Sequence, residues 1–475
     1  MIWSALLKRT VYCIIKLFDM PLNKKIVNEL KNICKDRCFT DQESLLLYGY
    51  DATRISHLPD AVIFPLNVEE VSRILKVANE NIVPVVPRGA GSGLTGGAVP
   101  INGGIVLSTE KMNRVLSISK DDLVAEVEPG VVTGTFKKML EAEGLYYPPD
   151  PASSEFSSIG GNIAENAGGL KAIKYGSTSN YVLGIEVVIP EGDVLWLGRH
   201  THKGVVGYNL KDLFIGSEGT LGVITKAILK LIPKPSSRST LFATYPDVYI
   251  STSIVTRILG TGILPCAMEF LDHASMSAVS AYLNTNVFDV NAGSALLIEV
   301  DGEPDETKSA IEKIASVCKK HAVSIEIAHD DDADKLWLAR RAISPALTKI
   351  KPFKLNEDVV VPLSKLPELV KGVEQIAEPL NLKYANFGHA GDGNIHVNIL
   401  YDAKEPDEYN RALRAVDQVF DLVIRLNGTI SGEHGVGITK LNYLTKELSP
   451  ATHNLMKKIK QTLDPNNIMN PGKAI

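Results

Sequence analysis

The order of apolar and polar residues divides residues 60–235 into short strands and amphipathic helices. Asn67 and Glu70 form a helix-capping pattern. The apolar positions after this cap recur at the spacing of one helix face: Val71, Ile74, Leu75 and Ala78. β-Branched runs at 82–86, 123–127 and 184–189 predict strands, and 133–143 predicts a second helix.

From residue 236 onward, longer amphipathic stretches alternate with short strands. Helices are predicted at 304–321, 333–350, 363–379 and 405–426, and strands at 296–300, 324–328, 358–361 and 384–387. This order predicts an α+β domain whose antiparallel sheet is covered on one side by helices. The prolines Pro233 and Pro235 mark a boundary. We therefore expect an N-terminal extension (1–20), a first domain (21–235), a second domain (236–425) and a C-terminal segment (426–475).

Glycine-rich segments gather in the first domain. Gly91-Ser-Gly-Leu-Thr-Gly96 follows a predicted strand and matches the dinucleotide fingerprint GxGxxG. The Rossmann mechanism also needs a helix directly afterwards, but Pro100 and the pair Gly103-Gly104 prevent one. What remains is a loop whose backbone N–H groups can bind an anion. Further glycine-rich runs at 160–169, 174–176 and 216–222 predict a large ligand that is wrapped by backbone.

Two histidines flank an Asp-Gly step in the second domain. Asp392-Gly393 predicts a two-residue hairpin turn, which would place His389 directly opposite His396 on one face, with Asn398 two residues further along. Glu433, within Ser431-Gly-Glu-His-Gly435, is the candidate third ligand. Two imidazoles and a carboxylate are typical of catalytic zinc sites and also of non-haem iron sites. We therefore expect a divalent metal, with zinc ahead of manganese or iron.

Composition narrows the possible classes of protein. The 475 residues are 45% hydrophobic with a net charge of −5, which excludes a disordered chain and gives no basic surface for nucleic acid. Five scattered cysteines favour a reducing compartment. Cys34 and Cys38 form a lone pair, which offers too few thiolates to hold an iron–sulfur cluster. Lys8, Arg9 and Lys16 interrupt the apolar N-terminus, so we expect neither a transmembrane segment nor a signal peptide. The expected location is cytoplasmic, and the alternative is a protein held at the membrane surface by a weak N-terminal helix.

Four motifs in order resemble a known flavin-binding architecture. They are Arg88–Gly97, Tyr147-Pro-Pro-Asp-Pro151, Gly160-Gly-Asn162 with Asn166-Ala-Gly-Gly169, and Gly216-Ser-Glu-Gly-Thr-Leu-Gly222. They resemble the FAD-binding domain of the vanillyl-alcohol oxidase type. The second half resembles the FAD-linked 2-hydroxy acid oxidoreductases, which include the glycolate oxidase FAD-binding subunit, D-lactate dehydrogenase and D-2-hydroxyglutarate dehydrogenase.

The resemblance implies that residues 21–235 bind FAD, that 236–425 form the substrate domain, and that 426–475 return to the flavin. The loop 87–97 contains no histidine, so non-covalent FAD is expected. The implied cofactor-binding residues are Arg88, Gly89, Ala90, Gly91, Ser92, Gly93, Pro151, Ser154, Gly160, Gly161, Asn162, Asn166, Gly168, Gly169, Tyr175, Gly176, Glu218, Gly219, Gly222, Ile224 and Asn470.

The resemblance also implies a chemistry, namely oxidation of a small D-2-hydroxy acid to the 2-oxo acid. His389, His396 and Glu433 would hold the metal, and His434 would be the base. Arg340 would bind the substrate carboxylate, and helical spacing places Ser344 one turn further on the same side. Asn398 completes the candidate catalytic residues.

The resemblance does not by itself name one substrate or one electron acceptor. The related D-2-hydroxyglutarate enzymes place a lysine where this chain has Asn356, just before Glu357-Asp358, which favours D-lactate or glycolate. Three alternatives stay open: a D-2-hydroxyglutarate dehydrogenase, a non-catalytic electron-transfer flavoprotein subunit, and a metal-dependent hydrolase or lyase. Expected partners are an iron–sulfur or flavoprotein subunit, or a quinone, that accepts electrons; an oligomer is possible.

Overall fold

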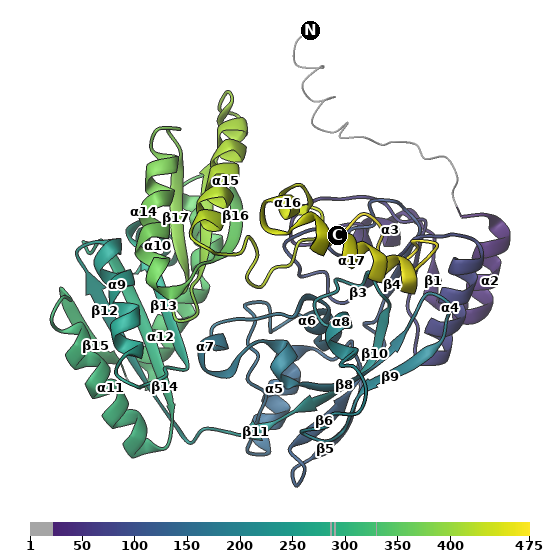
Figure 1. The fold of residues 1–475 in the computed structure, drawn as a ribbon, viewed down its shortest axis with the longest axis horizontal. Helices are drawn as coiled ribbons and strands as arrows, with labels where there is room; N and C mark the ends of the chain where they lie inside the picture. The colour runs from purple at the N-terminus through teal and green to yellow at the C-terminus, as the bar shows by residue number, and fades with distance from the viewer. Residues whose placement is uncertain (1–21, 286, 289–290, 329) are drawn as a thin grey trace.

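The structure, a computed structural model, describes residues 22–475 apart from 286, 289–290 and 329. Two lobes make up the molecule, and the C-terminal segment (yellow) lies on the first of them (Figure 1). The expected N-terminal extension and its surface helix lie outside the described residues. Within the described part of the chain, no helix has the length and apolar character needed to cross a membrane.

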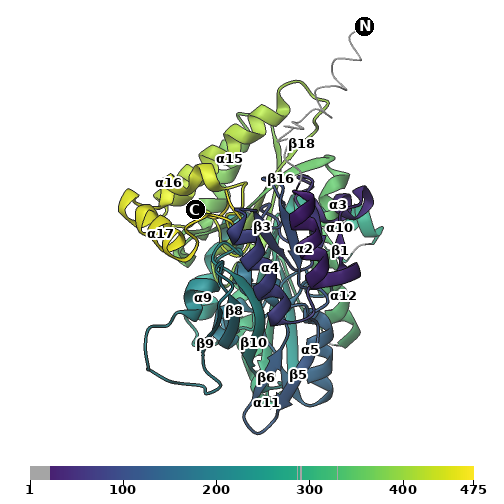
Figure 2. The same ribbon diagram turned by 90° about the vertical axis from the view of Figure 1, so that its right-hand side faces the viewer.

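The first lobe begins with a small sheet of strand order β1-β2-β4-β3. Its strands are β1 (Cys38–Phe39), β2 (Ala61–Ile63), β4 (Ile105–Ser108) and β3 (Val85–Arg88). Helices α2 (Lys24–Cys34) and α4 (Val68–Glu80) lie side by side against it (Figure 2), and α3 (Gln42–Tyr48) follows β1. Asn67 caps α4 by accepting the Glu70 N–H, and the predicted apolar face of α4 is fully buried.

A second, antiparallel sheet of order β5-β6-β10-β8-β9 completes this lobe. Its strands are β5 (Val115–Ser119), β6 (Val124–Val127), β10 (Val223–Lys230), β8 (Val182–Val188) and β9 (Val194–Gly198). Helices α5 (Thr133–Ala142) and α6 (Ile159–Glu165) pack on it. The shorter elements are β7 (Leu145–Tyr146), β11 (Ile232–Pro233), α7 (Ala172–Tyr175) and α8 (Lys211–Phe214).

The second lobe is built on an antiparallel sheet of seven strands in the order β15-β12-β14-β13-β17-β18-β16. The strands are β12 (Ser237–Tyr245), β13 (Ala267–Asp272), β14 (Ser294–Gly302), β15 (Ser324–Ala328), β16 (Phe353–Val360), β17 (Lys383–His389) and β18 (Asn394–Tyr401). The predicted α+β architecture with an antiparallel sheet is therefore confirmed.

Helices cover both faces of this sheet, so the expectation of a one-sided cover is wrong. One face packs on α9 (Val248–Leu259), α11 (Pro304–Cys318), α14 (Leu366–Ala377) and α15 (Glu408–Arg425). Part of the other face packs on α10 (His273–Leu283), α12 (Asp330–Arg341) and α13 (Ile343–Ala346). Apolar residues on both faces of β12, β13 and β14 require this second layer. The rest of the second face carries polar side chains.

Two elements are shorter in the structure than the sequence predicted. The helix expected at 333–350 breaks after Arg341, because Pro345 lacks an amide hydrogen and its ring would clash with the carbonyl of Arg341. The strand expected at 82–86 begins only at Val85, since Ile82 is exposed with φ +52°. Short 3₁₀ turns link several elements: Lys35–Arg37, Thr178–Tyr181, Leu347–Lys349, Leu363–Lys365 and Leu441–Tyr443.

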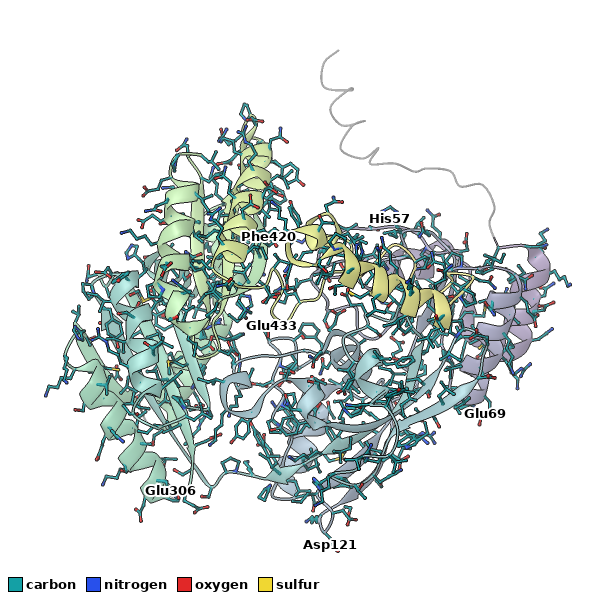
Figure 3. The ribbon with its side chains drawn as sticks, in the orientation of Figure 1. His57, Glu69, Asp121, Glu306, Phe420 and Glu433 are labelled. Atoms are coloured by element: carbon teal, nitrogen blue, oxygen red, sulfur yellow. The ribbon has the colours of Figure 1, made fainter. Side chains whose placement is uncertain are left out.

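After α15 the chain crosses back to the first lobe. Helix α16 (Leu444–Glu447) still packs against α15, and Lys446 bonds Asp421 there. Helix α17 (Pro450–Leu463) lies on the first lobe, and Met469 pairs in parallel with Val85 of β3 (Figure 1). Lys473, two residues before the last, is 2% exposed and donates to the Gly97 and Val99 carbonyls. The crossing segment carries Glu433 between the two lobes (Figure 3).

Candidate active site

A cavity of about 1320 Å³, counting the part that opens to solvent, lies in the first lobe. It is lined by the glycine-rich loop after β3, by α6 and by the segment before β10. Most of the cofactor-binding residues expected from the sequence line it: Arg88, Gly89, Ala90, Gly91, Ser92, Gly93, Pro151, Gly160, Gly161, Asn162, Gly168, Glu218, Gly219, Gly222 and Ile224. Glu433 and His434 line the same cavity.

The other six expected residues do not line the cavity. They are Ser154, Asn166, Gly169, Tyr175, Gly176 and Asn470. Asn470, for example, is 1% exposed and donates to the carbonyls of Gly97 (2.9 Å) and Glu218 (2.6 Å), which joins two walls of the cavity. Tyr175 donates to Asp301 of the second lobe at 2.9 Å. Asn470 therefore holds two walls of the cavity together without lining it, and Tyr175 links the two lobes.

Backbone conformation explains why the loop after β3 needs glycine. Gly91 has φ +68°, and a Cβ there would fall 2.2 Å from Nη2 of Arg88. The Arg88 side chain is folded beneath the loop, where it donates to the Tyr50 carbonyl at 2.7 Å and lies over the Tyr48 ring. The loop thus presents backbone to the cavity, which suits a phosphate-bearing cofactor such as FAD.

A buried carboxyl group in this cavity was not predicted. Glu165 ends α6, and its Oε2 atom is buried without a hydrogen-bond partner among the described residues. Burial and the nearby Glu218 raise the pKa of Glu165 well above its ordinary value. Within the motif 160–169 the only local signal was one charged residue among glycines, asparagines and apolar residues.

The hairpin that carries the two histidines has a different register from the predicted one. His396 lies opposite Phe387, not opposite His389, and the loop is four residues long, 390–393. The prediction that His389 and His396 lie directly opposite each other is therefore wrong. Since the register differs by two residues, the side chains keep their face, and the His389 and His396 rings still lie 5.2 Å apart.

Both histidines face Glu433. Its Oε1 atom lies 3.4 Å from Nε2 of His389 and 3.5 Å from Nε2 of His396. The donor atoms of this group lie within 4.8 Å of one another, which fits one cation. His434 lies next to it, with Nε2 3.9 Å from the same carboxylate oxygen and its ring stacked on His396 at 5.3 Å.

Glu269, a site residue that sequence reasoning missed, orients two of these groups. It is fully buried on β13; one carboxylate oxygen contacts Nδ1 of His389 at 2.7 Å. The other accepts from Nε (2.8 Å) and Nη2 (2.5 Å) of Arg340. A carboxylate behind a histidine is typical of metal ligands. The signal was a lone acid in the apolar strand 267–271, but its partners lie over 70 residues away.

Asp358, on β16, holds the loop that carries Glu433 and His434. Its Oδ2 atom accepts the backbone N–H groups of Gly432 (2.9 Å), Glu433 (2.8 Å) and His434 (2.8 Å). A second group that could hold a metal consists of Asp358, His396 and His434. Because Asp358 is already occupied by these donors, the group of His389, His396 and Glu433 is the better cation site.

The charges of the site are strongly coupled. Burial alone would lower the pKa of His389, but the carboxylates of Glu269 and Glu433 raise it well above its ordinary value. Burial lowers the pKa of His396 to about 3, with Glu433 opposing the change. Burial would raise the pKa of Glu433, but His389 lowers it. At neutral pH, His396 and Glu433 are therefore in the forms that bind metal, whereas His389 must first lose a proton.

The two remaining candidate catalytic residues, Asn398 and Ser344, lie in different surroundings. Asn398 is fully buried on the face of His396; it donates to the Ala385 and His396 carbonyls, and its Oδ1 atom has no partner among the described residues. Ser344 is exposed beyond the helix break, where its Oγ accepts from Lys354 at 2.6 Å. The regular helical relation to Arg340 expected for Ser344 is thus absent.

Comparisons with known proteins agree with this geometry. A model described as "FAD binding domain" matches residues 59–198, and one described as "FAD linked oxidases, C-terminal domain" matches 234–474. The chain is 42% identical over 456 residues to the glycolate oxidase subunit GlcD of Bacillus subtilis (strain 168), covering 95% of this chain and 97% of the relative. It is 36% identical over 458 residues to the D-2-hydroxyglutarate dehydrogenase of Stutzerimonas stutzeri (strain A1501), covering 94% and 98%.

Similarity extends to a D-lactate dehydrogenase and to solved folds. The D-lactate dehydrogenase of Anaerostipes hadrus is 34% identical over 460 residues, covering 94% of this chain and 97% of the relative. The structure of p-cresol methylhydroxylase with substrate bound superimposes with a TM-score of 0.78 at 20% identity, covering 95% of this chain and 96% of that one. At that identity the likeness concerns the fold alone.

The fold and the glycine-lined cavity define an FAD-binding protein of the vanillyl-alcohol oxidase type. Within that class, the chain belongs to the FAD linked oxidase family and is an FAD-linked oxidoreductase. Family membership removes the hydrolase and non-catalytic alternatives.

Proposed function

We propose that this protein oxidises a small D-2-hydroxy acid to the 2-oxo acid, with D-lactate and glycolate as the simplest substrates that supply the reacting atoms. The observation that carries the proposal is that Glu433 and His434 line the same cavity as the glycine-rich loops. A cation site and a base therefore adjoin the cofactor site. The names of the relatives, glycolate oxidase, D-lactate dehydrogenase and D-2-hydroxyglutarate dehydrogenase, support this reaction.

The candidate catalytic residues other than Ser344 each have a role in the proposal. Arg340 binds the substrate carboxylate; Glu269 engages its Nε and Nη2 atoms and leaves Nη1 without a bond to the described residues. His434 accepts the hydroxyl proton, as a general base. Asp358 positions His434 through the backbone, and Asn398 supplies a buried Oδ1 atom beside His396 that no described residue engages.

The two groups that the protein binds supply the remaining chemistry. The glycine-rich loop after β3 and the other residues that line the cavity would hold FAD, which would supply a hydride acceptor for the substrate Cα. A divalent cation, zinc before manganese or iron, held by His389, His396 and Glu433, would lower the pKa of the substrate hydroxyl.

Electrons must then leave the protein. The four described cysteines are buried free thiols, and none belongs to a group of metal-binding residues. We therefore propose an external acceptor, either an iron–sulfur or flavoprotein subunit or a quinone.

The test is anaerobic titration of the FAD-loaded protein with a panel of D- and L-2-hydroxy acids. Bleaching of the flavin absorption by D-acids, with formation of one equivalent of 2-oxo acid, is the expected result. If no 2-hydroxy acid bleaches the flavin, the proposed function is wrong.

A further inference from the structure

A carboxyl group without a hydrogen-bond partner lies at the end of the cavity that holds the candidate base. Glu165 lines this cavity, and no described residue bonds its buried Oε2 atom. A Cβ on Gly435 would fall 2.5 Å from that atom, and a Cβ on Gly97 would fall 3.1 Å from Oε1 of Glu165. Glu165 therefore lies between the glycine-rich loop after β3 and the residue that directly follows His434.

Glu218, a second buried carboxyl group, faces the same place. The Cβ position of Gly435 is 3.0 Å from its Oε1 atom. Glu218 accepts the backbone N–H groups of Val436 (2.8 Å) and Gly437 (2.7 Å), which stabilise a negative charge on it. Burial raises the pKa of both carboxyl groups, but the backbone bonds oppose the change at Glu218 alone. Of the two groups, Glu165 is therefore the one that keeps its proton.

The nearby cation Lys473 does not pair with Glu165. Its ammonium donates to two backbone carbonyls and to Oδ1 of Asn470 (2.6 Å). An ammonium has three donors, so none is left for Glu165. The acidic group of Asp51 acts on the pKa of Glu165 in the same direction as Glu218. The fold thus surrounds Glu165 with groups that favour the neutral acid, which carries one O–H donor.

The position of the base indicates which part of the cofactor meets Glu165. In the proposed function, the hydride leaves a substrate held at His434, so the isoalloxazine ring of FAD must lie at this end of the cavity. The ring presents nitrogen and carbonyl oxygen acceptors, and it gains negative charge when it is reduced. A hydrogen bond from a neutral acid becomes stronger as its acceptor gains negative charge. An ionised carboxylate at the same place would oppose reduction.

We propose that Glu165 is a neutral acid that donates a hydrogen bond to the isoalloxazine ring of FAD and thereby raises the midpoint potential of the flavin. Enzymes use carboxylic acids that are kept neutral by their surroundings as hydrogen-bond donors. Glu165 takes no proton from the substrate. The inference rests on the proposed function only for the end of the cavity at which the ring lies.

The experiment is a redox titration of the FAD-loaded protein against an indicator dye, without any hydroxy acid. Glu165→Leu keeps an uncharged side chain but removes the donor. We expect its equilibrium constant for two-electron reduction of the flavin to fall at least tenfold, which lowers the midpoint potential by about 30 mV. Glu165→Gln keeps a neutral donor of the same size and should have the potential of the unaltered protein. Glu80→Leu, at the exposed end of α4, is the control and should also leave the potential unchanged.

Two results would overturn the proposal. If Glu165 is ionised, both Glu165→Gln and Glu165→Leu remove a negative charge and raise the potential. If Glu165 bonds another part of FAD, or only supports the fold, Glu165→Leu binds oxidised and reduced FAD equally more weakly, and the potential does not change. Equilibrium dialysis of FAD measures that loss. Glu165→Gln tests the protonation state even if Glu165→Leu does not retain FAD.

The outcomes separate this inference from the proposed function, because the titration uses no substrate. If Glu165→Leu lowers the potential but no 2-hydroxy acid bleaches the flavin, the role of Glu165 stands and the proposed function fails. If D-lactate bleaches the flavin but Glu165→Leu has an unchanged potential, the proposed function stands and the role of Glu165 is wrong.

Discussion

Replacing Glu269 with Gln removes the negative charge that supports both His389 and Arg340, while the size of the side chain is kept. Burial would raise the pKa of Glu269, but His389 and Arg340 lower it from its ordinary value of 4.5 to about 2. At about 1.4 kcal/mol per pH unit, the pair contributes about 3 kcal/mol to folding. Because the pKa is lowered, this stability is present above pH 4.5 and is lost as the pH falls toward 2. The comparison is therefore made at pH 7.

Two measurements check this prediction. Metal-free Glu269→Gln should unfold several degrees below the unaltered protein, because Arg340 stays buried without its counter-charge. Its affinity for zinc, measured against a competing chelator, should fall about 10–100-fold, since the carboxylate behind His389 is lost. Glu326→Gln, at an exposed position of β15 in the same sheet, is the matched control and should change neither quantity. If Glu269→Gln behaves like this control, the role assigned to Glu269 is refuted.

Three further predictions concern the base, the cation and the loop after β3. His434→Ala should retain FAD and metal, but substrate should reduce the flavin of this variant about 10²–10⁴-fold more slowly, which is the range for a lost general base. If stopped-flow absorbance shows an unchanged rate of flavin reduction, His434 is not part of the mechanism. Zinc affinity should rise about tenfold per pH unit between pH 6 and 8, because the raised pKa of His389 means that binding must displace its proton; a flat profile in chelator competition would contradict this. Gly91→Ala should weaken FAD binding, because a Cβ would meet the Arg88 guanidinium at 2.2 Å and φ +68° is strained for alanine. Equilibrium dialysis of FAD measures the loss. Gly144→Ala is the control, since Gly144 also has a positive φ but has open space around its Cβ position.

Local patterns predicted the helix at Val68–Glu80 well. Its cap and its apolar face depend only on residues within a few positions of each other, and both are present in the structure. The hairpin shows the limit of such patterns. Asp392-Gly393 indicated a two-residue hairpin turn, but the loop has four residues. The rule for Asp-Gly hairpins considers the local sequence alone, so it takes no account of the pairing of β17 with β13. The imidazoles of His389 and His396 are neighbours all the same, because a register shift of two residues keeps the side chains on the same face of the strand.

By itself, the sequence determined which backbone segments can bind phosphate and which side chains can bind a cation. Glycines permit those conformations, and imidazoles and carboxylates have their donor atoms in any fold. Only the tertiary structure decided how the charges are paired. Glu269 and Asp358 gain their partners from elements more than seventy residues away. The physical reason is that a buried charge is stable only beside a partner that the whole fold brings to it.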